Sequence, residues 1–167
     1  MTDTRVRTDD LRAQLLALLA GHDARMPFDE AVADFPTAAI NSFPPNVPYT
    51  AWHLLEHLRI TQWDILDYIV NRTYVEMRWP DEYWPSREAT ATPGQFAATI
   101  DAFRTDNAAL QALVADPSTD LFAVIPDTPG HTILREVRVV ADHNSYHIGE
   151  FAIMRQLMGT WPRNRED

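Results

Sequence analysis

The chain contains no cysteine, and this absence narrows the chemistry that it can carry out. Disulfides, a thiolate nucleophile supplied by the protein, and zinc or iron–sulfur sites built on cysteine are all excluded. A metal ion bound by this chain must therefore be held by histidine, aspartate or glutamate.

Long apolar runs are also missing. No stretch approaches the roughly 18 consecutive apolar residues that a membrane-spanning helix needs. The first ten residues lack the apolar centre of an export signal. We therefore expect a cytoplasmic protein that does not enter a membrane.

Basic residues are too few and too dispersed for a nucleic-acid partner. The chain has 14 Lys and Arg residues against 24 Asp and Glu residues, which gives a net charge of −10. Binding to phosphates needs clustered positive charge, so we expect no nucleic-acid partner. Solubility explains the net negative charge at least as well as a functional acidic surface does.

The remaining composition is typical of a soluble globular protein, because 46% of its 167 residues are hydrophobic. We expect one domain over residues 1–167. Apolar residues recur at helical spacing in four segments separated by Gly- and Pro-containing connections. These segments run from a cap at Asp9 or Asp10 to Gly21, from Ala51 to Val70, from about Pro93 to Asp116, and from about Thr132 to Met158. The pattern predicts an all-α protein, a four-helix bundle with long connecting loops.

Four of the six histidines form two pairs with i, i+4 spacing. His53 and His57 lie in the second expected helix, and His143 and His147 lie in the last one. This spacing puts both imidazoles of a pair on one helix face, from which both can reach one ion. A single pair is more often surface or core histidine, but two pairs on separate helices of a bundle favour a metal site. Neither pair has the Glu of the HExxH motif, so a zincin-type protease is not indicated.

Carboxylates accompany both pairs. Glu150 follows His147 by three residues, and Asp64 shares the helix face of His57. Either could orient an imidazole or accept a proton as a catalytic base, and Glu150 is the better candidate of the two.

Two segments around these histidines resemble the DinB/YfiT-like superfamily. They are the segment from Ala51 to Asp64 and the segment from Asp142 to Glu150, which contains His-Asn-Ser-Tyr-His-Ile-Gly-Glu. The resemblance implies a four-helix bundle that binds one divalent metal ion through three histidines, one from the second helix and two from the last. These roles fall on His57, His143 and His147, and leave His53 as a structural or pocket-lining residue. Imidazole ligands suit zinc and nickel, which we expect equally.

Three imidazoles leave at least one coordination position open, as in catalytic metal sites. Such an ion can activate a water, a carbonyl or a thiol. The resemblance implies transferases and isomerases that use thiols such as bacillithiol, mycothiol or glutathione. We therefore expect a metal-dependent S-transferase that joins a low-molecular-weight thiol to a small-molecule electrophile in stress response or detoxification. The alternatives are a metal-activated hydrolase on the same histidines and a non-catalytic, stress-related binding protein.

Two further expectations concern surfaces. The aromatic segment from Trp79 to Pro85 is a candidate lid over the pocket. The second helix is apolar over a broad arc, formed by Trp52, Leu54, Leu55, Leu58, Trp63, Ile65, Leu66, Ile69 and Val70. A surface helix needs an apolar stripe of only about 100°, so we expect the partner subunit of a symmetric homodimer to cover the surplus, with the long loops as the alternative cover.

Overall fold

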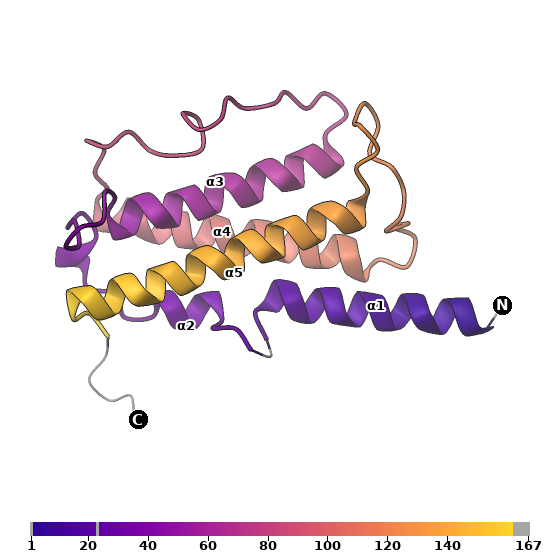
Figure 1. Ribbon diagram of the computed structural model, residues 1–167, viewed down its shortest axis with the longest axis horizontal. Helices are drawn as coiled ribbons and strands as arrows, with labels where there is room; N and C mark the ends of the chain where they lie inside the picture. The colour runs from indigo at the N-terminus through magenta and orange to yellow at the C-terminus, as the bar shows by residue number, and fades with distance from the viewer. Residues whose placement is uncertain (1, 23, 162–167) are drawn as a thin grey trace.

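The computed structural model describes residues 2–22 and 24–161, and these form a helical bundle (Figure 1). Its long helices are α1 (Thr2–Ala20), α3 (Ala51–Val70), α4 (Pro93–Ala115) and α5 (Ile133–Met158). A short helix α2 (Phe28–Val32) and a 3₁₀ turn η1 (Thr37–Ala39) lie between α1 and α3. Within the described part of the chain, β pairing is limited to one isolated bridge between Val124 and Thr132. The predicted all-α bundle is confirmed.

Local capping explains where most of these helices begin and end. The hydroxyls of Thr50, Thr92 and Thr132 accept hydrogen bonds from backbone N–H groups in the first turns of α3, α4 and α5. Gly159 ends α5 in the left-handed conformation, with a φ of 62°. The predicted start of the first helix is wrong, because α1 begins at Thr2 rather than at Asp9 or Asp10. The polar residues before Leu11 continue the helix instead of capping it.

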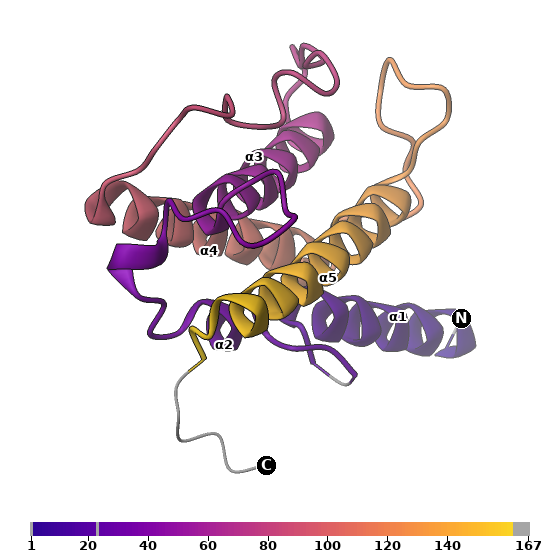
Figure 2. The same ribbon diagram turned by 60° about the vertical axis from the view of Figure 1, so that its left-hand side comes forward.

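The core is built mainly on α3, which packs against α4 and α5, while α1 packs against the same two helices from the other side. Figure 2 shows α1 and α3 separated by the α4–α5 pair. Buried apolar side chains form two clusters. One lies near α2 and includes Phe28, Leu55, Leu58, Phe103 and Ile148. The other lies near α1 and includes Leu15, Ile65, Leu110, Val137 and Ala141.

A network of side-chain amides lies between the two apolar clusters. Gln62 of α3 is fully buried. Its Nε2 donates to the Phe103 carbonyl at 2.7 Å. Its Oε1 accepts from Asn107 of α4 at 3.2 Å and from Asn144 of α5 at 2.8 Å. A single glutamine therefore connects three helices in the middle of the bundle.

The broad apolar arc of α3 is covered largely by the chain itself. Leu54, Leu55 and Leu58 are at most 1% exposed, and only Trp63 and Val70 of the nine arc residues are exposed, at 43% and 52%. Residues 71–92 run back along α3 as one long connection (Figure 1). The surplus apolar surface of α3 therefore gives no support to a homodimer, which stays a prediction.

Within the described residues, no helix combines the length and the apolarity that crossing a membrane requires.

We predict that Gln62→Leu destabilises the bundle. The substitution leaves the buried amide of Asn144 without its acceptor and removes one of the two acceptors of the half-buried Asn107 amide, and an unsatisfied buried group costs about 1–3 kcal/mol. The free energy of unfolding from urea titration should fall by about 2 kcal/mol or more, whereas Gln156→Leu, at an exposed position of α5, should change it by less than about 0.5 kcal/mol. Equal stability of the two variants would show that the network contributes little.

Candidate metal centre

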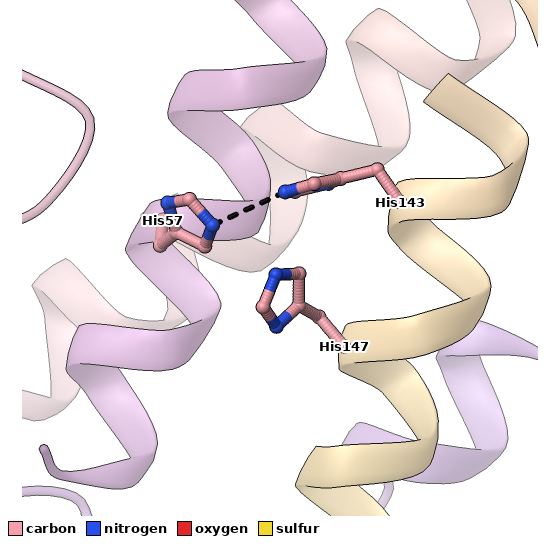
Figure 3. Close-up of side chains that lie close together, drawn as sticks. All are labelled: His57, His143 and His147. Carbon is pink, nitrogen blue, oxygen red and sulfur yellow. Dashed lines mark hydrogen bonds between the residues drawn. The ribbon is translucent and has the colours of Figure 1, made fainter. Parts of the chain in front are cut away.

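Three histidines from two helices meet between α3 and α5 (Figure 3). His57 comes from α3, and His143 and His147 come from successive turns of α5. Each offers one ring nitrogen, and these three atoms all lie within 4.8 Å of one another. The Nε2 atoms of His57 and His143 are 3.1 Å apart. Two nitrogens bound to one tetrahedral zinc ion would be about 3.4 Å apart, given bonds of about 2.1 Å. The residues present therefore fit a divalent ion.

The ring of His57 is oriented by the segment between α3 and α4. Its Nδ1 lies 2.8 Å from the backbone carbonyl oxygen of Tyr83. Because a carbonyl can only accept, Nδ1 carries the proton and Nε2 keeps its lone pair for the centre of the cluster. The indole of Trp84 stacks on the imidazole, with ring centroids 3.8 Å apart and planes 7° apart. His57 is therefore held on its edge and on its face.

His147 is oriented in a comparable way by Glu150. The Nδ1 atom of His147 lies 2.7 Å from the Glu150 Oε2 atom, one helical turn further along α5. A carboxylate on Nδ1 fixes the ring and makes the other nitrogen a better ligand. The sequence suggested two roles for Glu150, orienting an imidazole or accepting a proton. This contact gives it the orienting role. Burial also raises the pKa of Glu150, so its carboxylate is a stronger base than an exposed one.

His143 contributes the third nitrogen, and it is the one histidine of the three whose Nδ1 atom is not held by an acceptor among the described residues. Its Nε2 faces the Nε2 of His57, while its Nδ1 is buried without a hydrogen-bond partner among the described residues. Because the Nε2 atom of His57 keeps its lone pair, a proton on the Nε2 atom of His143 joins the two rings in a hydrogen bond, and a bound cation would take the place of that proton.

All three imidazoles are poised in the neutral form that metal binding requires. Burial lowers the pKa of His57, while the Tyr83 carbonyl opposes this. Burial and the neighbouring His57 lower the pKa of His143 to about 4. Burial and the two other histidines lower the pKa of His147 to about 3. Near neutral pH each ring is therefore neutral and keeps one nitrogen lone pair that can bind a cation.

Asp64, the other candidate base, has a different set of contacts. Its two carboxylate oxygens accept from the hydroxyls of Tyr74 at 3.0 Å and Tyr83 at 2.8 Å. Asp64 follows His57 by two helical turns, or about 10 Å along α3. Burial raises the pKa of Asp64, while the two tyrosine hydrogen bonds lower it. Asp64 thus anchors the 71–92 segment, whose Tyr83 carbonyl orients His57.

His53 has a structural role, as expected. It occupies the third position of α3, where its Nδ1 accepts from the backbone N–H of Thr50 at 3.1 Å. Its Nε2 lies 3.1 Å from the Ser86 carbonyl oxygen. Both ring nitrogens are therefore occupied, and His53 completes the capping box of α3.

Two other histidines also lie outside the cluster. His131 contacts the Tyr68 hydroxyl through Nδ1 at 2.9 Å, and His22 is exposed.

The aromatic segment from Trp79 to Pro85 contributes the ring of Trp84 and the backbone carbonyl of Tyr83 to the centre. Trp84 stacks on His57, whereas Trp79 is 70% exposed and contacts Tyr83 with a centroid separation of 5.3 Å. The sequence marked the segment but did not distinguish the two tryptophans. It also gave no sign that a backbone carbonyl of this segment would contact a histidine.

The comparisons with known proteins agree with this architecture. The family model of the DinB superfamily matches residues 20–151, which include α3, α4, most of α5 and all three histidines. The chain belongs to the DinB superfamily. Comparisons with curated proteins and with solved structures give no significant match.

The lowered pKa values predict that the metal-free protein loses stability in mild acid. The unfolded chain takes up protons at imidazoles of ordinary pKa 6.5, whereas folded His143 and His147 take them up only near 4 and 3. The unfolded state therefore binds more protons in this range, and the free energy of unfolding falls as the pH is lowered from 6.5 towards about 4. Urea titrations of chelator-treated protein at successive pH values measure this slope. The His143→Ala, His147→Ala variant should show a shallower slope, and an equal one would contradict the assignment.

Proposed function

We propose that this DinB-superfamily protein binds one divalent metal ion, zinc or nickel, through His57, His143 and His147. The observation that carries the proposal is the convergence of three neutral ring nitrogens within 4.8 Å. In His57 and His147 the opposite nitrogen is already engaged by an acceptor, so the ligating nitrogen is directed inward. Tyr83 and Glu150 thus act as the orienting partners that metal-ligating histidines usually have.

We further propose that the metal site is that of an enzyme that conjugates a low-molecular-weight thiol to a small electrophile. When bound, the ion supplies a Lewis acid that lowers the pKa of a thiol or a water. Three protein ligands leave room for such a group, and the chain has no cysteine to compete for that position. Stress response and detoxification are the settings that this chemistry would serve.

The side chains around the cluster suit this role. Trp84 covers one face of His57 and keeps water from it. Glu150 holds His147 in place, and its raised pKa suits it to take the proton that a thiol releases. The sulfur then forms its bond to the electrophilic carbon as the leaving group departs. The same centre would also serve a metal-activated hydrolase, in which Glu150 takes a proton from water instead.

The metal proposal predicts a dependence on particular histidines. Wild-type protein should bind about one zinc or nickel ion per chain, as expected for a single three-histidine site. His143→Ala and His147→Ala should each remove tight binding, whereas His53→Ala should retain it because both ring nitrogens of His53 have other partners. Elemental analysis after dialysis measures the stoichiometry, with circular dichroism as the check on folding. Loss of metal in His53→Ala alone would show that the wrong histidine of α3 was assigned.

The activity proposal predicts metal-dependent consumption of thiol. Bacillithiol, mycothiol and glutathione are each mixed with 1-chloro-2,4-dinitrobenzene, and the rise in thioether absorbance is followed as chloride leaves. Metal-loaded wild-type protein should accelerate conjugation of at least one thiol, and the His143→Ala, His147→Ala variant should not. Metal-dependent hydrolysis of p-nitrophenyl acetate without conjugation would assign the hydrolase instead. Tight metal binding with neither activity would favour a non-catalytic binding protein.

A further inference from the structure

A cavity of about 400 Å³ lies on the side of α5 that faces away from the three histidines. The α5 residues that line it are Ala141, Asn144, Ser145 and Ile148, which alternate along the helix with His143 and His147. Its other walls are the last turn of α1, residues 21 and 25–29, and α4. None of the three histidines lines it. The volume falls within the range of about 300–1,000 Å³ that is usual for small-molecule sites.

One part of this cavity is apolar. Leu19, Phe28, Phe103 and Ile148 are buried and contribute to its lining. The rings of Phe28 and Phe103 stack with centroids 3.9 Å apart. This surface suits a hydrocarbon chain or a ring rather than a polar metabolite.

The charged groups of the cavity are mainly positive. Its single lining carboxylate, Asp29, pairs with the Nε of Arg104 at 2.8 Å. The partly buried Arg25 donates to the backbone carbonyls of Ala141 at 2.8 Å and Leu18 at 2.7 Å. None of the described carboxylates forms an ion pair with Arg25. Its guanidinium has five N–H donors, so it can hold these carbonyls and bind an anion as well.

We propose that this cavity binds a small amphipathic monocarboxylate. The carboxylate would lie at Arg25, and the apolar portion would lie along Phe28, Phe103 and Ile148. Charge balance supports an acid over a neutral molecule, because the carboxylate would neutralise a guanidinium whose partners among the described residues are backbone carbonyls. A cationic ligand is disfavoured for the same reason. This site is independent of the metal centre.

The probes for the test are octanoate and octan-1-ol, which share a chain and differ in the charged group. Nuclear magnetic resonance titration should show that octanoate shifts the amide signals of Gly21, Ala141 and Ile148. Octan-1-ol should bind at least about tenfold more weakly, because this is the usual effect of losing a charged hydrogen-bond partner. Equal affinity for the two probes would overturn the carboxylate assignment. Shifts centred on His57 instead would overturn the location, because they would place octanoate at the metal centre.

Two substitutions at neighbouring exposed positions of α4 test the location further. Ala108 lines the cavity and Ala109 does not. Ala108→Trp should fill the cavity and abolish octanoate binding, whereas Ala109→Trp should keep the affinity within about twofold of wild type, as surface substitutions usually do. Binding that survives Ala108→Trp, or that is lost equally in both variants, would reject this cavity as the site.

Arg25→Gln tests the charged contact. It should weaken octanoate binding by about tenfold and leave octan-1-ol binding unchanged, since only the anion uses the guanidinium. Unchanged octanoate affinity would reject the role of Arg25. Thermal unfolding checks that Arg25→Gln folds. If this variant does not fold, the comparison of octanoate with octan-1-ol on wild-type protein decides the carboxylate assignment. Metal content, measured on the same samples, should be unaltered in every variant.

Discussion

The packing of α3 against α5 is the constraint on which the candidate metal centre depends. His57 and Gln62 lie five residues apart on α3, and their respective partners, His143 and Asn144, are adjacent on α5. Sliding one helix past the other by a turn would separate the histidines and would also leave the Asn144 side-chain N–H without its acceptor on Gln62. Buried polar groups are costly when unpaired, so this network selects one alignment of the two helices. The same residues that define the bundle therefore define the geometry of the cluster.

The position of the amides in all three helices supports this view. Gln62 lies between Leu58 and Ile65 on α3, and Asn107 lies between Phe103 and Leu110 on α4. Asn144 likewise lies between Ala141 and Ile148 on α5. Each helix thus changes from one apolar cluster to the other at its amide residue. Apolar side chains of similar size could pack in several alignments, whereas the amide network pairs correctly in one.

The 71–92 segment belongs to the centre as much as the helices do. Asp64 binds it through the hydroxyls of Tyr74 and Tyr83, and the carbonyl of Tyr83 in turn holds His57. Asp64 therefore acts on His57 through the loop and without touching it.

This chain of contacts could not be predicted from sequence, because it joins residues 19 and 26 positions apart through irregular backbone. The helix ends and the paired histidines could be predicted, because capping and i, i+4 spacing are local properties. The missed start of α1 has a related cause: Asp9 and Asp10 suit a cap, but they are also tolerated inside a helix.

Helix α5 also explains why neighbouring residues in the His143–Ile148 stretch serve different surfaces. Successive residues of an α-helix are rotated by about 100°, so residues 143 and 147 share one face, while residues 141, 144, 145 and 148 share another. The first face forms the histidine cluster with α3, and the second forms the cavity with α1 and α4. Ser145 lies between the paired histidines in sequence yet lines the cavity, which removes it as a nucleophile for chemistry at the metal centre. The two surfaces thus share one helix but no lining residue, and each faces different partner helices of the bundle.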